Sequence, residues 1–170
     1  MTPDILFSAE QIQQRVRVMA RQIAASPLVP DVAMPVLVGG FVFAADLLRA
    51  LAWEGVAMDV EMIWLRSYGD KRAASAISMI AGPSEQIAGH HVLVIDGVLD
   101  FGRTIKKAVA LIEAAGAASV QVAVALDKKR PGAMAKADYV AFESGNDFVI
   151  GYGMDDAGKH RALPYISKVT

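Results

Sequence analysis

The stretch that decides the fold is VLVIDGVLDFGRT, which runs from Val92 to Thr104. Its apolar first half predicts a buried strand over His91–Ile95 that ends at Asp96. The residues that follow predict a loop over Val98–Gly102 and a helix over Arg103–Ala115. Ligands of open parallel sheets bind beyond the carboxyl ends of the strands, so we expect a site at this loop.

The chain beyond this helix predicts a parallel sheet. The helix stops at Gly116, and Ser119–Leu126 predicts the next strand. A strand, a loop, a helix and a second strand form a βαβ unit, in which the strands run parallel with a right-handed crossover. The polar stretch Arg66–Ser75 predicts an exposed loop. Other short strands are expected at Pro35–Val38, Val60–Leu65, Ala76–Ile80, Tyr139–Phe142 and Phe148–Ile150. The fold class is therefore α/β.

Two helices are expected before this unit. Ser8 with Gln11 three residues later is a capping-box pattern, and apolar residues at helical spacing follow from Ile12. This helix should end near Pro27, because proline cannot continue a helix. Phe41–Trp53 predicts the second helix.

Composition limits the classes of function. The chain has 170 residues, 54% hydrophobic and 21% charged, which fits one globular domain over residues 1–170. Its net charge of −1 gives no general attraction to nucleic acid or anionic lipid. It has no cysteine, which excludes disulfides and thiolate chemistry. The N-terminus lacks the pattern of a secretory signal, and the uncharged stretch Val32–Ala45 is too short to span a bilayer, so we expect a cytoplasmic location.

The loop between the central strand and its helix carries the residues of an anion site. Backbone amides at a helix start can hold a phosphate, and Gly102 allows close approach. Arg103 and Thr104 add a charge and a hydroxyl. The carboxylates of Asp96 and Asp100 suit ribose hydroxyls, magnesium or proton transfer. From spacing alone, an alternative stays open, in which Asp100 caps the helix and the glycines only make turns.

The same stretch resembles the signature of type I phosphoribosyltransferases. That signature is a strand, two acidic residues, two apolar residues, Asp, Ser or Thr, Gly, any residue and Thr. VLVIDGVLDFGRT matches it in register with two departures. Gly97 stands where the second acidic residue is usual, and Phe101 stands where the hydroxyl residue is usual.

Flanking segments resemble the hypoxanthine-guanine members of that family, in the family's order from about Val36 to Ile166. LVGGFVFAADLLRAL resembles the segment of the pyrophosphate loop, where the family usually has Leu-Lys-Gly, often with a cis peptide. The other segments are SYG of the lid loop, LDK of the purine site, and ADYVAFE, DFVIGYGMD and RALPYI of the purine hood. The resemblance implies a central, mostly parallel twisted sheet flanked by helices, a purine-binding hood over about residues 138–170, and a homodimer or homotetramer.

The resemblance also implies an activity in purine salvage. Members transfer the phosphoribosyl group of phosphoribosyl pyrophosphate (PRPP) to hypoxanthine or guanine with Mg²⁺, giving IMP or GMP and pyrophosphate. Asp100 is then the general base, Asp155 a magnesium ligand, and Ser67 and Tyr68 belong to the lid. The PRPP-binding residues would be Asp96, Phe101, Gly102, Arg103, Thr104, Val38, Gly39 and Arg161. The purine-binding residues would be Lys128, Phe148 and Val149.

Each role has a plainer alternative. Lys128 could belong to a solvated basic turn, Phe148 to the core, and Asp155 and Arg161 to the ordinary surface. Three departures at the PRPP side, Gly97, Phe101 and Val38 (in place of the loop lysine), raise a second hypothesis, a non-catalytic module that binds purine or nucleotide as a sensor or regulator. A third hypothesis is activity on another base or sugar phosphate. The three histidines have no metal-ligand spacing.

Overall fold

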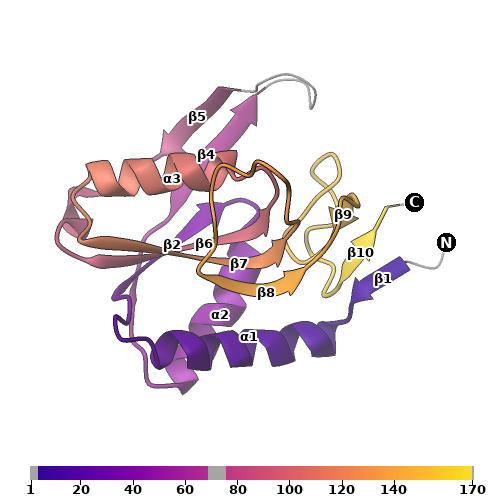
Figure 1. The fold of residues 1–170 in the computed structure, drawn as a ribbon, viewed down its shortest axis with the longest axis horizontal. Coiled ribbons are helices and arrows are strands. Elements are labelled where there is room, and N and C mark those ends of the chain that lie inside the picture. Colours follow the sequence, from indigo (N-terminus) through magenta and orange to yellow (C-terminus); the bar gives the residue numbers. More distant parts are fainter. Residues whose placement is uncertain (1–3, 69–75, 170) are drawn as a thin grey trace.

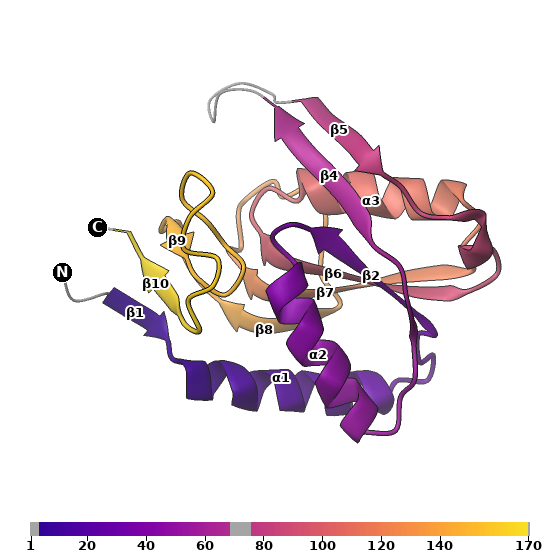
Figure 2. The same cartoon turned by 180° about the vertical axis from the view of Figure 1, so that it is seen from behind.

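The protein is described here by a computed structural model that covers residues 4–68 and 76–169. Figures 1 and 2 show a large sheet between helices and a smaller sheet at the side where both termini lie. The elements are β1 (Asp4–Phe7), α1 (Ala9–Ala24), β2 (Val32–Leu37), α2 (Phe41–Trp53), β3 (Asp59–Val60), β4 (Ile63–Tyr68), β5 (Ala76–Ala81), the 3₁₀ turn η1 (Glu85–Ile87), β6 (His91–Leu99), α3 (Arg103–Ala114), β7 (Ser119–Asp127), β8 (Tyr139–Glu143), β9 (Val149–Ile150) and β10 (Ile166–Lys168).

The large sheet confirms the predicted α/β class. Its strands follow the order β5-β4-β2-β6-β7-β8, with β3 paired to β2. β4 and β5 pair antiparallel, whereas β2, β6, β7 and β8 pair with their neighbours in parallel. The predicted βαβ unit is β6-α3-β7, and it lies at the centre of the sheet.

The central strand β6 is apolar on both faces because both faces are covered. Leu93 and Ile95 pack in the core with α1 and α2, whereas Val92 and Val94 pack in a second core with α3. Alternation along a strand sends neighbouring side chains to opposite faces, so an uninterrupted apolar run is what a central strand needs. Figure 1 shows α3 on one face and α1 with α2 on the other.

The N-terminal cap of α1 is the one that the sequence predicts. The Ser8 hydroxyl accepts from the Gln11 amide at 3.3 Å, and the Gln11 side chain accepts from the Ser8 amide at 2.8 Å. None of the described helices has the length and apolar character that crossing a membrane requires.

The smaller sheet joins both ends of the chain, in the order β1-β10-β9. The sequence did not predict β1 or β10, because each is too short for a recognisable alternation. β8, which the expected hood boundary at about residue 138 included, lies instead in the large sheet. Tyr152, just after β9, donates to Asp46 of α2 at 2.8 Å and so ties the C-terminal segment to the helical layer.

Several predicted boundaries were wrong. β6 does not end at Asp96 but pairs with β7 as far as Leu99, so the loop shortens to residues 100–102. The strand expected at Val60–Leu65 is split between β3 and β4. Residues 66–68 of the predicted exposed loop belong to β4, and residues 69–75 lie outside the described part of the chain.

Candidate active site

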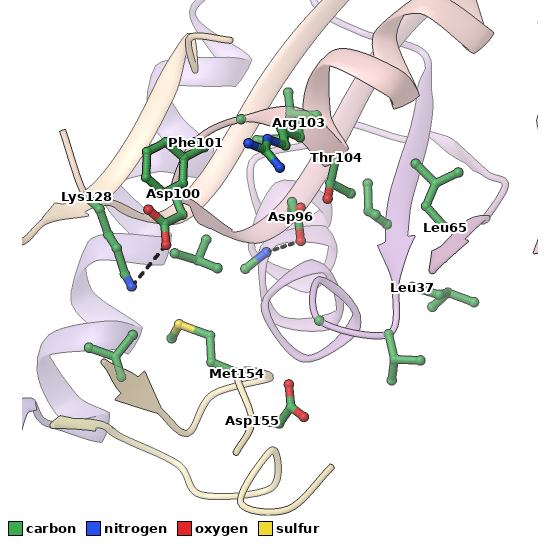
Figure 3. Close-up of a pocket in the computed structure, with 18 of the residues that line it drawn as sticks. Leu37, Leu65, Asp96, Asp100, Phe101, Arg103, Thr104, Lys128, Met154 and Asp155 are labelled. Atoms are coloured by element: carbon green, nitrogen blue, oxygen red, sulfur yellow. Dashed lines mark hydrogen bonds and ion pairs between the residues drawn. The ribbon is translucent and has the colours of Figure 1, made fainter. Parts of the chain in front are cut away.

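A cleft of about 1100 Å³ opens at the carboxyl ends of the central strands and the start of α3. This is the place where parallel sheets bind ligands. The cleft is lined by all of the predicted PRPP, purine and magnesium residues, namely Val38, Gly39, Asp96, Asp100, Phe101, Gly102, Arg103, Thr104, Lys128, Phe148, Val149, Asp155 and Arg161. Figure 3 shows the labelled members of this group converging from β6, α3, β7 and the C-terminal segment.

The start of α3 has the form of an anion cradle. Its N-cap is Gly102, with φ of 74°, a left-handed conformation that favours glycine. A Cβ atom there would lie 2.8 Å from the Ala135 amide nitrogen, so only glycine fits. The first amides of a helix have no partner within it, and a glycine N-cap has no side chain to cap them. They are suited to hold a phosphate.

Phe101 does not bury its ring in this cradle. The side chain is 49% exposed, and the Arg130 guanidinium lies 5.2 Å from the ring centroid. Figure 3 shows the ring beside Asp100 and away from Thr104. The bulk that Phe101 adds is therefore directed toward Asp100 and Arg130.

Asp100 is held by two cations rather than by a helix end. Its Oδ1 accepts from Arg130 Nε at 2.6 Å, and its Oδ2 lies 3.4 Å from Lys128 Nζ. Because Gly102 is the N-cap of α3, the alternative that Asp100 caps this helix is wrong. A carboxylate and an ammonium group thus lie side by side in the cleft.

The basic run after β7 is not a solvated turn. Lys128 is only 8% exposed, and the Arg130 side chain is 20% exposed. Lys129, between them, points to solvent and pairs with Asp127 at 3.2 Å and Glu143 at 2.9 Å. Burying an ammonium group is costly unless it has a charged partner, and Asp100 supplies one for Lys128.

Asp96 lies buried where β6 passes the loop after β2. Its Oδ1 accepts from the Gly97 amide at 2.7 Å. Burial raises the pKa of Asp96 to about 7, against the opposing effect of that hydrogen bond. A Cβ atom at Gly97 would lie 2.8 Å from the Gly39 carbonyl oxygen, so the loop after β2 occupies the space that a second acidic side chain would need.

That loop and the C-terminal segment form the opposite wall. The peptide bond between Leu37 and Val38 is cis. Arg161 pairs with Asp155 through Nη2 and Oδ1 at 2.8 Å and donates to the Gly153 carbonyl at 2.6 Å. Asp155 also accepts from the Gly158 amide at 2.7 Å. Both side chains are thus anchored in the cleft wall, which argues against ordinary surface charges.

Phe148 and Val149 lie at the start of β9. Phe148 is 40% exposed and lines the cleft, so it is not a core residue. Val149 is buried and also lines the cleft. Ser67 and Tyr68, predicted for a lid, end β4, and the rest of that predicted lid lies outside the described residues.

Sequence reasoning assigned no role to three further lining residues, Arg130, Asn146 and Met154. Arg130 donates to Asn146 Oδ1 as well as to Asp100. The sequence feature that could have identified Arg130 is its place as the third cation of the run after β7, at the carboxyl edge of the sheet. Met154 lies within the predicted segment DFVIGYGMD, but no role was predicted for its side chain.

The cleft offers oxygen donors to a metal without forming a protein cage. The described residues contain no group of three or more His, Asp or Glu that could hold a metal ion. Magnesium bound together with substrate phosphates needs only one or two carboxylates and keeps several waters. Asp96 and Asp155 both line the cleft, so the donor set fits that mode.

Comparison with known proteins identifies the family. Residues 4–157 match the phosphoribosyl transferase domain. The hypoxanthine-guanine phosphoribosyltransferase of Dictyostelium discoideum is 30% identical over 99% of this chain and 96% of its own, and that of Bacillus subtilis is 31% identical over 95% and 90%. The bifunctional protein TilS/HprT of Listeria innocua is 34% identical over 95% of this chain, which spans 25% of that protein's length.

Solved structures agree with the sequence matches. The 1.4 Å crystal structure of the hypoxanthine phosphoribosyltransferase of Trypanosoma cruzi has a TM-score of 0.85 to this chain and 34% identity, covering 98% of this chain and 96% of that one. A structure of the same enzyme in complex with the product IMP also has a TM-score of 0.85 and covers 98% of this chain and 93% of that one.

Proposed function

The chain belongs to the phosphoribosyl transferase domain family, and on that premise we propose that it is a purine-salvage enzyme. It transfers the 5-phosphoribosyl group of PRPP to a 6-oxopurine, hypoxanthine or guanine, and releases pyrophosphate. The products are IMP and GMP. Relatives that carry the names of this activity match the chain over nearly its whole length.

The observation that carries the proposal is the pairing of Lys128 with Asp100 in the cleft. O6 and N7 lie side by side on one edge of a 6-oxopurine. A donor and a carboxylate 3.4 Å apart suit an O6 acceptor next to a protonated N7. Adenine carries an amino donor at position 6, which an ammonium group repels, so the pair selects oxopurines. Phe148 at the edge of the cleft supplies a ring on which the purine stacks.

PRPP is bound by the opposite half of the cleft. The amides of Gly102, Arg103 and Thr104 receive its 5-phosphate, helped by the dipole of α3. Asp96 binds the ribose hydroxyls. Val38, Gly39 and Arg161 bind the pyrophosphate, and Phe101 borders the phosphate without contributing a hydroxyl.

Magnesium is the cofactor of this proposal, and Asp155, which lines the cleft, would hold it together with the substrate. When bound, the ion neutralises charge on the leaving pyrophosphate. Arg161 fixes the Asp155 carboxylate at 2.8 Å, and the Gly158 amide fixes its second oxygen. These contacts orient Asp155 toward the cleft before substrate arrives.

Asp100 acts as the general base. As N9 of the purine bonds to C1′ and the bond from C1′ to the pyrophosphate oxygen breaks, the N7 proton passes to the Asp100 carboxylate. Lys128 binds O6 through this step. Ser67 and Tyr68, at the end of β4, keep their predicted place in a lid whose closure would exclude water from the developing charge.

The test is an assay with PRPP, Mg²⁺ and each of hypoxanthine, guanine, xanthine and adenine. We expect IMP and GMP, with little AMP. If no base gives a nucleotide at high enzyme concentration, while calorimetry detects purine or nucleotide binding, the chain is the sensor of the second hypothesis. A product from a different base supports the third. A homodimer or homotetramer and a cytoplasmic location stay predictions; gel filtration with light scattering tests the first.

A further inference from the structure

Arg130 makes three contacts that bring three segments of the chain together. Its Nε donates to Asp100 Oδ1 at 2.6 Å, and its Nη1 donates to Asn146 Oδ1. Its guanidinium also lies over the Phe101 ring, with 5.2 Å between Cζ and the ring centroid. Asp100 and Phe101 precede α3, Arg130 follows β7, and Asn146 precedes β9.

These contacts use the chemistry that distinguishes arginine from lysine. A guanidinium group is planar, carries several donors in fixed directions and stacks on aromatic faces. Two hydrogen bonds and the contact with the Phe101 ring restrict the rotation of the Arg130 guanidinium. The Arg130 side chain is 20% exposed, so water screens its pairing with Asp100 less than at an open surface.

We infer that Arg130 is a positioning residue that fixes the general base Asp100, and that Phe101 is its platform. The inference rests on the proposed function. It also gives the unusual Phe101 a purpose, because a serine or threonine at that position offers no face for a guanidinium. The loss of a phosphate-binding hydroxyl is accompanied by the gain of a rigid carboxylate.

The two oxygens of Asp100 then have different tasks. Oδ1 stays bound to Arg130 at 2.6 Å, whereas the contact of Oδ2 with Lys128 is longer, at 3.4 Å. When a purine enters, Lys128 turns to O6 and Oδ2 accepts the N7 proton. The proton leaves the base as the N9–C1′ bond forms and the C1′–pyrophosphate bond breaks, so charge and atoms balance.

The first experiment compares Arg130→Lys and Arg130→Met with Arg17→Lys and Arg17→Met as matched controls. Arg17 is exposed on α1, outside the cleft. We expect Arg130→Met to lower kcat for IMP formation by about 10- to 100-fold, because misplacing a reacting group by 1 Å costs about 100-fold. The KM for PRPP should change less than about threefold. Arg130→Lys should have a kcat close to that of Arg130→Met. An ammonium group cannot bind Asp100 and Asn146 and also contact the Phe101 ring as a guanidinium does.

The second experiment tests whether Arg130 acts through Asp100. In an Asp100→Asn background, Arg130→Met should lower kcat by less than about twofold, because the group that it positions is already disabled. Phe101→Leu should lower kcat in the wild-type background. In an Arg130→Met background, Phe101→Leu should leave kcat unchanged. Additive losses in these cycles would overturn the inference.

Other outcomes are equally decisive. If Arg130→Met and Arg130→Lys keep kcat within about twofold of the wild type, Asp100 does not need Arg130 to position it and the inference is wrong. If Arg130→Met does not fold, as judged by its thermal melt, Arg130→Lys and Phe101→Leu decide by the same criteria. A wild-type protein without any transferase activity would contradict the proposed function instead.

Discussion

Replacing Lys128 by methionine tests how the cleft selects its base. The ammonium is 8% exposed and lies 3.4 Å from Asp100, so it is already desolvated and aimed at the place where O6 should lie. A hydrogen bond to a charged group contributes about 1.5–3 kcal/mol. Each 1.4 kcal/mol is tenfold, so we expect kcat/KM for hypoxanthine to fall by about 10- to 150-fold.

The assay follows nucleotide formation from hypoxanthine and from adenine with saturating PRPP and Mg²⁺. Adenine should not lose rate in Lys128→Met, because the variant removes a donor that opposes its amino group. The ratio of kcat/KM for hypoxanthine to kcat/KM for adenine should therefore fall by about the same factor. Lys129→Met is the matched control, since Lys129 points to solvent beside Asp127 and Glu143. A Lys128→Met enzyme with unchanged kcat/KM for hypoxanthine would refute this assignment.

Three further predictions concern the other carboxylates and the crowded glycine. Asp100→Asn should lower kcat by about 100-fold or more, as the loss of a general base does, with thermal unfolding close to that of the wild type. Gly97→Asp, which adds the carboxylate usual in the family, should destabilise by about 1–3 kcal/mol in urea unfolding, because its Cβ meets the Gly39 carbonyl; an unchanged stability with better PRPP binding would contradict the geometry. Burial raises the pKa of Asp96 from 3.8 to about 7, so the folded protein binds this proton more tightly than the unfolded chain does. The protonated Asp96 therefore stabilises the folded state fully below pH 3.8, and this stabilisation is lost as the pH rises through about 7. Asp96→Asn should abolish that decline in urea unfolding between about pH 4 and pH 7, and a decline of the same size in the variant would exclude Asp96 as its cause.

The sequence predicted the centre of the fold well because one pattern there allows only one structure. An apolar run, an Asp-Gly loop and an amphipathic helix require a βαβ unit, and β6, α3 and β7 form it. The end of β6 was wrong by several residues. Gly97 is a turn signal in sequence, but here it makes room for the Gly39 carbonyl while the strand continues to Leu99.

The smaller sheet could not be predicted from local patterns. β1 and β10 are short and lie at opposite ends of the chain, and only tertiary contact pairs Asp4 with Lys168. Propensity and alternation describe neighbours in sequence, so they carry no information about such a pairing.

The candidate site, like the fold, was predicted only in part from the sequence. Residues inside family segments, such as Asp100 and Lys128, were predicted, and all those outside the lid line one cleft. Arg130 was missed because its role depends on Phe101 and Asn146, which come from different parts of the chain. From the sequence, Phe101 showed only that the usual hydroxyl residue is absent, because a sequence does not give the orientation of a side-chain ring.

The measurement that tests the central claim most directly is a crystal structure of the protein with IMP. We expect the 5-phosphate oxygens within about 2.7–3.2 Å of the amides at Gly102, Arg103 and Thr104. O6 should lie beside Lys128 and N7 beside Asp100. A nucleotide bound elsewhere, or a Phe101 ring filling the start of α3 so that no phosphate enters, would contradict the account.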